Sequence, residues 1–230
     1  MAHVLVTGAN RGLGLEFVRQ LLARGERVIA TCRQPGRALE LTRLAGEYPG
    51  HLTVLPLSLP EARSIADLAR AVEALDLSIG LLINNAGLTI AGEHFGTLEL
   101  DNLRSAFNAN AAGPLLLTQA LAPSLIDGAK VVNLSSRLGS IALTSALYTP
   151  SYGISKAALN MVGKLLSIAL AEHGVTVVAI SPGWVRTDMG GANAPLAVAD
   201  SVAGMLAVID RLQLADSGRF LSHEGDEIPW

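Results

Sequence analysis

The sequence VVNLSSRLGSIALTSALYTPSYGISK, residues 131–156, decides the fold of this chain. It begins with an apolar run that is typical of a buried strand, and Ser136 follows at the carboxyl end of that strand. The Thr-Pro pair at 149–150 is typical of the N-cap and first turn of a helix. In that helix Tyr152 and Lys156 are four residues apart and share one face. The stretch therefore predicts a hydroxyl, a phenol and an amine at one edge of a sheet.

The spacing of Tyr152 and Lys156 has a chemical consequence. A phenol titrates near pH 10, so activity near pH 7 requires a pKa lower by about 3, which is roughly 4 kcal/mol. One cation about 4 Å away supplies that much at an effective dielectric of about 20. We therefore expect Lys156 to lower the pKa of Tyr152. A surface lysine near a helix start is the alternative, because this spacing alone is a common accident.

The bulk composition favours one large domain, residues 1–230. Charged residues make up 16% of the chain, against a usual value of about 25%, which predicts self-association. The net charge of −3 offers no electrostatic basis for binding nucleic acid or an anionic membrane. No apolar run reaches the roughly 18 residues of a membrane span.

The cysteine and histidine residues bear on the cellular compartment and on whether the chain binds a metal. The single cysteine, Cys32, cannot form an internal disulfide and fits a reducing compartment. No secretory signal is visible in MAHVLVTGAN, so we expect a cytoplasmic protein. We expect no metal site, because the histidines lie far apart without ligand spacing: His3, His51, His94, His173 and His223.

A glycine-rich turn follows the first predicted strand, 3–7. The turn reads TGANRGLG, residues 7–14, and an amphipathic helix follows it through Ala23. A turn between a strand and a helix in this way typically binds a dinucleotide, with the pyrophosphate facing the helix N-terminus. The alternative is that the glycines only make a turn.

The second predicted strand, 27–32, ends at Arg33. Enzymes that hold an unphosphorylated ribose place a carboxylate near this point, and residues 31–33 offer none. Arg11, in the glycine-rich turn, supplies another guanidinium. Two arginines suit a 2′-phosphate, so the sequence predicts NADPH in preference to NADH. Either arginine alone is equally well an ordinary solvated residue.

The remaining pattern alternates strands with helices. We expect further strands at 52–57, 80–83, 175–180 and 218–221, and helices at 36–46, 61–75, 97–126, 150–172 and 197–212. Alternation of this kind predicts an α/β fold, a single Rossmann-type doubly wound parallel sheet of about seven strands with helices on both faces. Ligands of such sheets lie beyond the carboxyl ends of the strands, where every motif above is expected.

The two longest predicted helices carry further signals. Pro114 disturbs the hydrogen-bond ladder of the first, so we expect a local distortion around Asn110. Both helices are apolar on more sides than one sheet can cover. We therefore expect a homodimer through the helices around 98–126 and 150–172.

The motifs occur in a characteristic order: TGANRGLG, NNAG at 84–87, Asn110, Ser136 with Tyr152 and Lys156, and SPGWVRT at 181–187. Over essentially the whole chain this order resembles the short-chain dehydrogenase/reductase family. ATCR, LSSRLGSI and the final IPW resemble the sniffer and C-factor branch of carbonyl-reductase-like proteins.

The resemblance implies a role for each catalytic position. Tyr152 exchanges a proton with the substrate, and Ser136 hydrogen-bonds the substrate oxygen. Lys156 lowers the pKa of the tyrosine and holds the nicotinamide ribose, and Asn110 positions a water. Together with Tyr152 and Lys156, the positions implied to line NADP(H) are Gly8, Asn10, Arg11, Leu13, Gly14, Arg33, Ser58, Leu59, Asn85, Ala86, Gly87, Pro182, Gly183, Val185 and Thr187.

Two departures from the family pattern matter. Ser58 stands where the family commonly has an aspartate for the adenine amino group, and a neutral hydroxyl is a weaker acceptor. The Leu59 backbone N–H is then expected to contribute more. The segment between Ser136 and Tyr152 is longer than usual and contains Ile141, Leu143 and Leu147, which favours an apolar substrate. A solvent-facing bulge with scattered leucines is the alternative.

The resemblance implies NADPH-dependent reduction of an aldehyde or ketone, most consistent with an apolar carbonyl compound. A dinucleotide-binding signalling or regulatory protein of C-factor type, in which turnover is secondary, is the alternative from another class. Oxidation of an alcohol would use the same residues in the opposite direction.

Overall fold

The computed structural model describes residues 2–230. Its centre is a seven-stranded sheet in the order β3-β2-β1-β4-β5-β6-β7, and all paired strands run parallel. The strands are β1 (His3–Thr7), β2 (Val28–Cys32), β3 (Leu52–Pro56), β4 (Ile79–Asn84), β5 (Leu125–Leu134), β6 (Thr176–Ser181) and β7 (Phe220–Ser222). The predicted doubly wound Rossmann-type sheet is confirmed.

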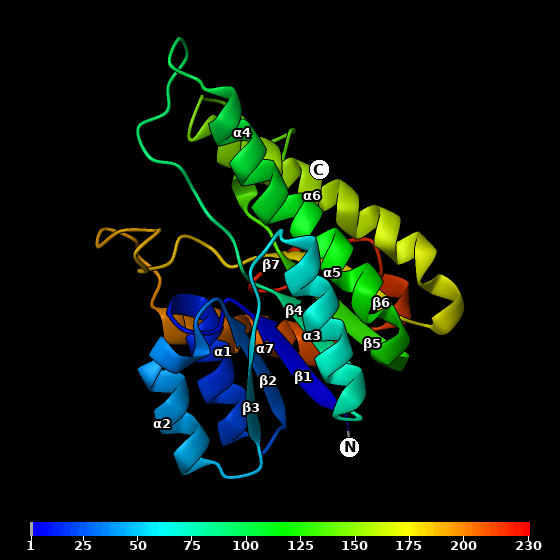
Figure 1. Cartoon of the computed structure of the whole chain (residues 1–230). Helices are drawn as coiled ribbons and strands as arrows, with labels where there is room; N and C mark the ends of the chain where they lie inside the picture. Colours follow the sequence, from blue (N-terminus) through cyan, green and yellow to red (C-terminus); the bar gives the residue numbers. More distant parts are fainter. Residues whose placement is uncertain (1) are drawn as a thin grey trace.

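Helices cover both faces of the sheet (Figure 1). They are α1 (Gly12–Ala23), α2 (Leu39–Glu47), α3 (Ala62–Ala74), α4 (Leu100–Phe107), α5 (Gly113–Leu121), α6 (Pro150–Ala169) and α7 (Val198–Arg211). One core cluster joins the sheet to α1, α2 and α7, and a second joins it to α3, α5 and α6. Successive residues of β1 enter opposite clusters, because side chains alternate along a strand.

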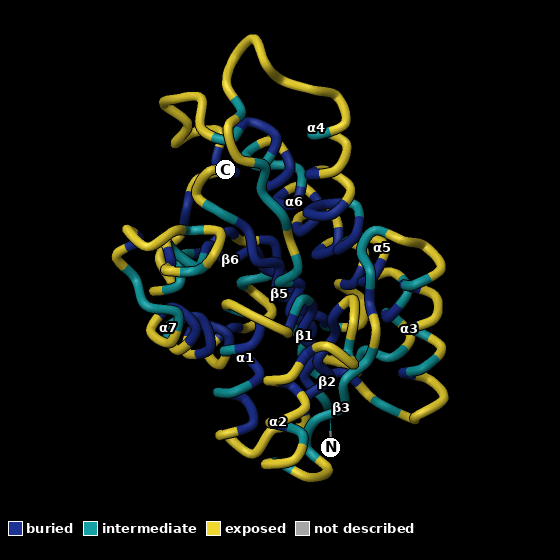
Figure 2. Tube along the Cα trace, turned by 60° about the vertical axis from the view of Figure 1, so that its left-hand side comes forward, coloured by how far each residue is buried: buried dark blue, intermediate teal, exposed yellow. Residues whose placement is uncertain are grey.

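Burial follows from this layering. Every residue of β2 and β6 is buried, while edge strand β3 is only partly covered. Figure 2 shows buried residues running through the strands and the inward sides of the helices, with the connecting loops exposed. Strands covered on both faces read as continuous apolar runs, which is why the sequence located them. Within residues 2–230, no helix combines the length and apolarity that crossing a bilayer requires.

The predicted helix 97–126 was wrong in its extent. The structure replaces it with α4, a π-helix (η2, Asn108–Ala112) and α5, and α5 ends at Leu121. A short 3-10 turn containing Pro123 follows, since proline cannot continue the ladder. Strand β5 then begins at Leu125, six residues before the apolar run at 131. Its first half contains Gly128 at φ 76, and the pairing with β4 shifts register nearby, so no strand pattern was visible there.

Candidate active site

The carboxyl ends of β1, β4, β5 and β6 bring the predicted motifs together. The strand order reverses between β1 and β4, and this switch point is where open α/β sheets bind ligands. Asn84 pairs with Asn133, so the segments that follow β4 and β5 leave the sheet at the same level. The glycine-rich turn after β1 and Ser136 after β5 therefore lie at one edge.

The phenol, the hydroxyl and the amine meet as the sequence predicted. Tyr152 lies in the first turn of α6, and Nζ of Lys156 lies 5.5 Å from the centroid of its ring. Ser136 hydrogen-bonds the phenol, and its Oγ also accepts a hydrogen bond from the Leu138 N–H at 3.2 Å. That backbone bond caps a one-turn 3-10 helix and fixes the serine hydroxyl beside the phenol.

Lys156 is tied to the strand that delivers Ser136. Its Nζ donates a hydrogen bond to the carbonyl oxygen of Leu134, the last residue of β5, at 2.6 Å. The side chain is only 4% exposed, and burial lowers the pKa of Lys156 from 10.5 to about 8. Burial disfavours the charged form of an amine, so this lysine releases its proton far more readily than a surface lysine.

The expected direction of the Tyr152 pKa was wrong. Burial raises the pKa of Tyr152 from 10.0 to about 12, and the hydrogen bond with Ser136 offsets only part of that rise. A full charge about 4 Å from the phenol would lower its pKa by the expected amount only if moving the phenolate out of water cost nothing. The same burial that weakens the charge of Lys156 also penalises the phenolate. In this structure Tyr152 is therefore protonated at neutral pH.

Asn110 lies in the predicted distortion, which is the π-helix 108–112. Its Nδ2 donates to the carbonyl oxygen of Leu88 at 2.8 Å and to Oγ of Ser155 at 2.9 Å, and its Oδ1 accepts from the Leu88 N–H at 2.8 Å. Ser155 in turn donates to the Tyr152 carbonyl at 2.7 Å. A fully buried amide thus joins the segment after β4 to the helix that carries the phenol. The water expected beside Asn110 stays a prediction.

A second buried connection was not predicted from the sequence. Ser135 donates from Oγ to Oδ1 of Asn160 at 2.6 Å, and Nδ2 of Asn160 donates to the Gly139 carbonyl at 3.2 Å. Gly139 lies so close to α6 that a Cβ there would be 2.7 Å from the carbonyl carbon of Lys156. These contacts hold the turn that carries Ser136 against the helix. The available signal was the spacing, because Asn160 is four residues beyond Lys156 on the same helical face.

The glycine-rich turn is clamped to the end of β4. The Oγ1 of Thr7 accepts hydrogen bonds from the N–H groups of Asn85 at 3.0 Å and Ala86 at 2.9 Å. Asn85 also donates from its side chain to the Thr7 carbonyl at 2.7 Å. Gly8 has φ +63, and a Cβ on Gly14 would lie 2.3 Å from the Gly8 oxygen. Only glycine permits that approach, so the two strand ends form one bare backbone cradle.

A hollow of about 310 Å³ lies beside this cradle and is lined by Asn10, Arg33, Gln34, Arg37 and Ala38. Two guanidiniums and no carboxylate line it, which fits a dianionic phosphate. Arg11, expected to pair with Arg33, lies elsewhere, and its Nη1 binds Oδ2 of Asp188 at 2.7 Å. Arg37 takes its place at the end of a 3-10 turn (η1, Pro35–Arg37), which the sequence pattern did not reveal.

The remaining predicted cofactor positions border the same edge in different ways. Leu13 packs on the core, and Gly87 is close enough to Asn110 that a Cβ would lie 3.1 Å from its Oδ1. Ser58 donates from Oγ to Oε1 of Glu61 at 2.7 Å, which brings a carboxylate near the expected adenine position. Leu59, the next residue, packs beside α5.

The loop after β6 is held by its own contacts. Oγ of Ser201 donates to the Pro182 carbonyl at 2.7 Å, and Gly183 has φ +83. Val185 is buried, and Oγ1 of Thr187 accepts from the Gly190 N–H at 3.0 Å. The loop is therefore preformed beside the glycine-rich turn, where a Cβ on Gly12 would lie 3.8 Å from the Thr187 methyl carbon.

The burial of Lys156 predicts a pH dependence of stability. Its folded pKa of about 8 lies below the ordinary 10.5, so between these values the unfolded chain binds a proton that the folded chain has released. The free energy of unfolding of the wild type, relative to Lys156→Met, should therefore rise as the pH increases from about 8 to about 10.5. Denaturant unfolding at several pH values measures this difference. Lys164→Met, at an exposed position on α6, gives the baseline, and a flat or falling difference would contradict the prediction.

Comparison with known proteins agrees with this geometry. The family model described as short chain dehydrogenase matches residues 2–195. C-signal of Myxococcus xanthus is 43% identical over 154 residues, 66% of this chain and 93% of that protein. The NADPH-bound carbonyl reductase from chicken fatty liver is 40% identical, with a TM-score of 0.93 over 100% of this chain and 99% of that chain. Carbonyl reductase Sniffer of D. melanogaster is 30% identical, with a TM-score of 0.94 over 100% of both chains. The sniffer and C-factor resemblance is thereby confirmed, and the chain belongs to the short-chain dehydrogenase family.

Proposed function

We propose that this protein is a single-domain NADPH-dependent reductase of an aldehyde or ketone. The observation that carries the proposal is the meeting of Tyr152, Ser136 and Lys156 at the sheet edge that also carries the glycine cradle. The cationic hollow of Arg33 and Arg37 supports a phosphorylated cofactor. Similarity to the carbonyl reductase from chicken fatty liver, which binds NADPH, adds further support.

The residues would act as binding, orienting and proton-transfer groups. When bound, the nicotinamide supplies a hydride to the carbonyl carbon. Ser136 orients the carbonyl oxygen, and Oη of Tyr152 gives its proton to that oxygen as negative charge develops there. Nζ of Lys156, whose pKa is about 8, can then return a proton toward the phenolate. Asn110 keeps the segment after β4 in place during these steps.

The state of Tyr152 favours reduction over oxidation. A proton donor must be protonated before the reaction, and a phenol with a pKa of about 12 meets that condition at neutral pH. Oxidation of an alcohol requires the phenolate as base, which burial disfavours here. Reduction is therefore the direction that we propose, and the ratio of reduced to oxidised cofactor decides it.

The borders of the candidate site support an apolar substrate. The segment between Ser136 and Tyr152 presents exposed apolar side chains, and the loop after β6 adds two more. They are Ile141, Leu143, Leu147, Tyr148, Trp184 and Met189. The alternative for this segment, a solvent-facing bulge with scattered leucines, predicts the same exposure. An apolar carbonyl compound stays our proposal because the segment lies between Ser136 and Tyr152 in the chain and the loop follows β6, whose carboxyl end lies at the same edge of the sheet.

The similarity to C-signal favours a second candidate, a dinucleotide-binding signalling protein. The four candidate catalytic residues argue for turnover, since Asn110, Ser136, Tyr152 and Lys156 are all present and hydrogen-bonded. A cytoplasmic location also stays a prediction, based on the single cysteine.

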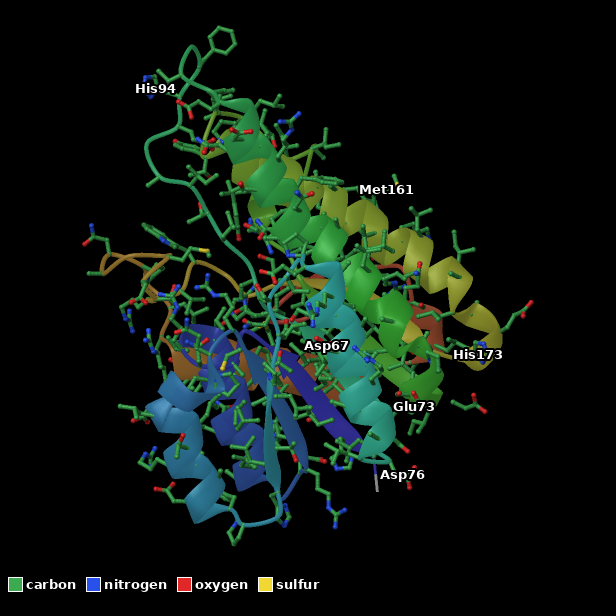
Figure 3. All side chains as sticks on the ribbon, viewed as in Figure 1. Asp67, Glu73, Asp76, His94, Met161 and His173 are labelled. Atoms are coloured by element: carbon green, nitrogen blue, oxygen red, sulfur yellow. The ribbon has the colours of Figure 1, made fainter. Side chains whose placement is uncertain are left out.

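We further propose that a second copy of the chain covers the outer face of α6. Met161, Leu165 and Ile168 are 59%, 53% and 66% exposed, and Figure 3 shows Met161 pointing away from the body of the protein. Phe107 on α4 and Leu116 on α5 are also exposed, and both helices contact α6. A two-fold axis would pack α6 against its copy. Sedimentation should show a dimer, and a stable monomer would contradict it.

Replacing the phenol tests the proposed chemistry. Tyr152→Phe should lower kcat for carbonyl reduction by about 100-fold or more, because it removes the proton donor. NADPH binding should persist, because the ring and the cofactor cradle remain. Turnover is measured by NADPH absorbance and binding by calorimetry. Retained turnover in Tyr152→Phe would refute the mechanism, and a cellular role that survived loss of turnover would favour the signalling candidate.

The cationic hollow predicts cofactor preference. The wild type should use NADPH with a higher kcat/KM than NADH, and Arg33→Ala or Arg37→Ala should each reduce that preference by about 10-fold or more. Arg11→Ala should change it less, because Arg11 is paired with Asp188 outside the hollow. Steady-state kinetics with NADPH and with NADH measures this preference for the wild type and each variant. A wild type that prefers NADH would overturn the proposal.

A further inference from the structure

Helix α6 lacks the side-chain cap that its sequence predicted. Thr149 occupies the N-cap position, but its side chain makes no capping hydrogen bond, and its Oγ1 is buried without a partner. Its backbone lies in the left-handed region, at φ 38 and ψ 63, which is rare for a β-branched residue. The free N–H groups at the start of the catalytic helix therefore need another acceptor.

That acceptor comes from a distant loop. Oε2 of Glu93 accepts a hydrogen bond from the Ser151 backbone N–H at 3.0 Å, and Oε1 accepts from the Ser151 hydroxyl. Ser151 is 1% exposed and immediately precedes Tyr152. A carboxylate at this position both fills the cap and interacts favourably with the positive end of the helix dipole.

Glu93 belongs to the segment 85–99 between β4 and α4. The start of this segment is fixed by Asn85 at the glycine cradle and by Leu88 on Asn110. Beyond Glu93 the chain projects outward, with Phe95 86% exposed, and Figure 3 shows neighbouring His94 on this outlying loop. Glu93 thus anchors the outer part of a loop that would otherwise end in solvent.

We propose that Glu93 is a positioning residue that tethers the 85–99 segment to the catalytic helix through Ser151. The inference rests on the proposed reductase function, in which the part of this loop around Glu93 would border the substrate site. Because one carboxylate joins the loop to the turn that carries Tyr152, the loop and the phenol are set in place together. Neither Glu93 nor Ser151 lines the hollow of Arg33 and Arg37, so the tether should affect the carbonyl substrate and leave cofactor affinity unchanged.

Variants of Glu93 separate the hydrogen bonds from the charge. Glu93→Ala should lower kcat/KM for a carbonyl compound about 10- to 100-fold, because small displacements of reacting groups are costly. Glu93→Gln can still accept from the N–H and donate to the hydroxyl, so it should stay within about 5-fold of wild type. Glu99→Ala removes the same side chain from the same segment, where it makes no capping bond, and should match wild type.

Ser151→Ala tests the residue that Glu93 contacts on α6. It removes the hydroxyl contact and keeps the N–H contact, so a loss of about 3- to 10-fold is expected. Combined with Glu93→Ala it should add little, because both changes break one connection. The Kd for NADPH should be unchanged in all variants. A loss of cofactor affinity parallel to the loss of turnover would indicate general damage and would overturn a positioning role.

Amide hydrogen exchange gives a readout that does not depend on turnover. In Glu93→Ala, residues 151–154 and the 88–99 loop should exchange faster than in wild type or Glu99→Ala, and Glu93→Gln should restore protection. Unchanged exchange together with kcat/KM within about 2-fold of wild type would refute the tether. A wild type that reduces no carbonyl compound would refute the proposed function, while the exchange result alone would still decide the tether.

Discussion

The contact on which the rest of the site depends is the hydrogen bond from Nζ of Lys156 to the carbonyl of Leu134. It ties the middle of α6 to the last residue of β5, so helix and strand meet at a fixed height. The Ser135–Asn160 bond and the close approach of Gly139 hold the next turn in the same position. Ser136 therefore faces Tyr152 because the backbone on either side of it is bound to the helix.

Burial of this junction also determines its electrostatics. It raises the pKa of Tyr152 and lowers the pKa of Lys156, in each case toward the neutral form. The pair is thus a protonated phenol beside an amine that titrates near neutral pH. In the proposed mechanism, Tyr152 donates its proton to the substrate and Lys156 then returns a proton to Tyr152. Lys156 is buried and Tyr152 is half-buried, and for each group the loss of water contacts has the largest effect on the pKa.

Much of the fold could be predicted because its signals are local. Buried strands are continuous apolar runs, the glycine-rich turn has a recognisable spacing, and Pro114 correctly indicated a distortion at Asn110. The start of β5 was not predicted, because its first half contains Gly128 at positive φ and mixes polar with apolar residues. Arg37 could not be picked out from the sequence, because it joins Arg33 at the hollow only through the short turn η1, and the Arg11–Asp188 pair links positions 177 residues apart.

The features that could not be predicted from the sequence depend on how the folded chain surrounds each residue. The spacing of Tyr152 and Lys156 correctly predicted their neighbourhood but not the cost of burial, which reversed the expected pKa direction. Likewise, Thr149 looked like a helix cap, whereas the carboxylate that caps the helix is Glu93, 58 positions away from Ser151.

The most direct test of the account is a spectrophotometric titration of tyrosinate, comparing wild type with Tyr152→Phe. The account predicts no ionisation of Tyr152 below about pH 11, and a midpoint at or below about 10, the ordinary phenol value, would contradict it.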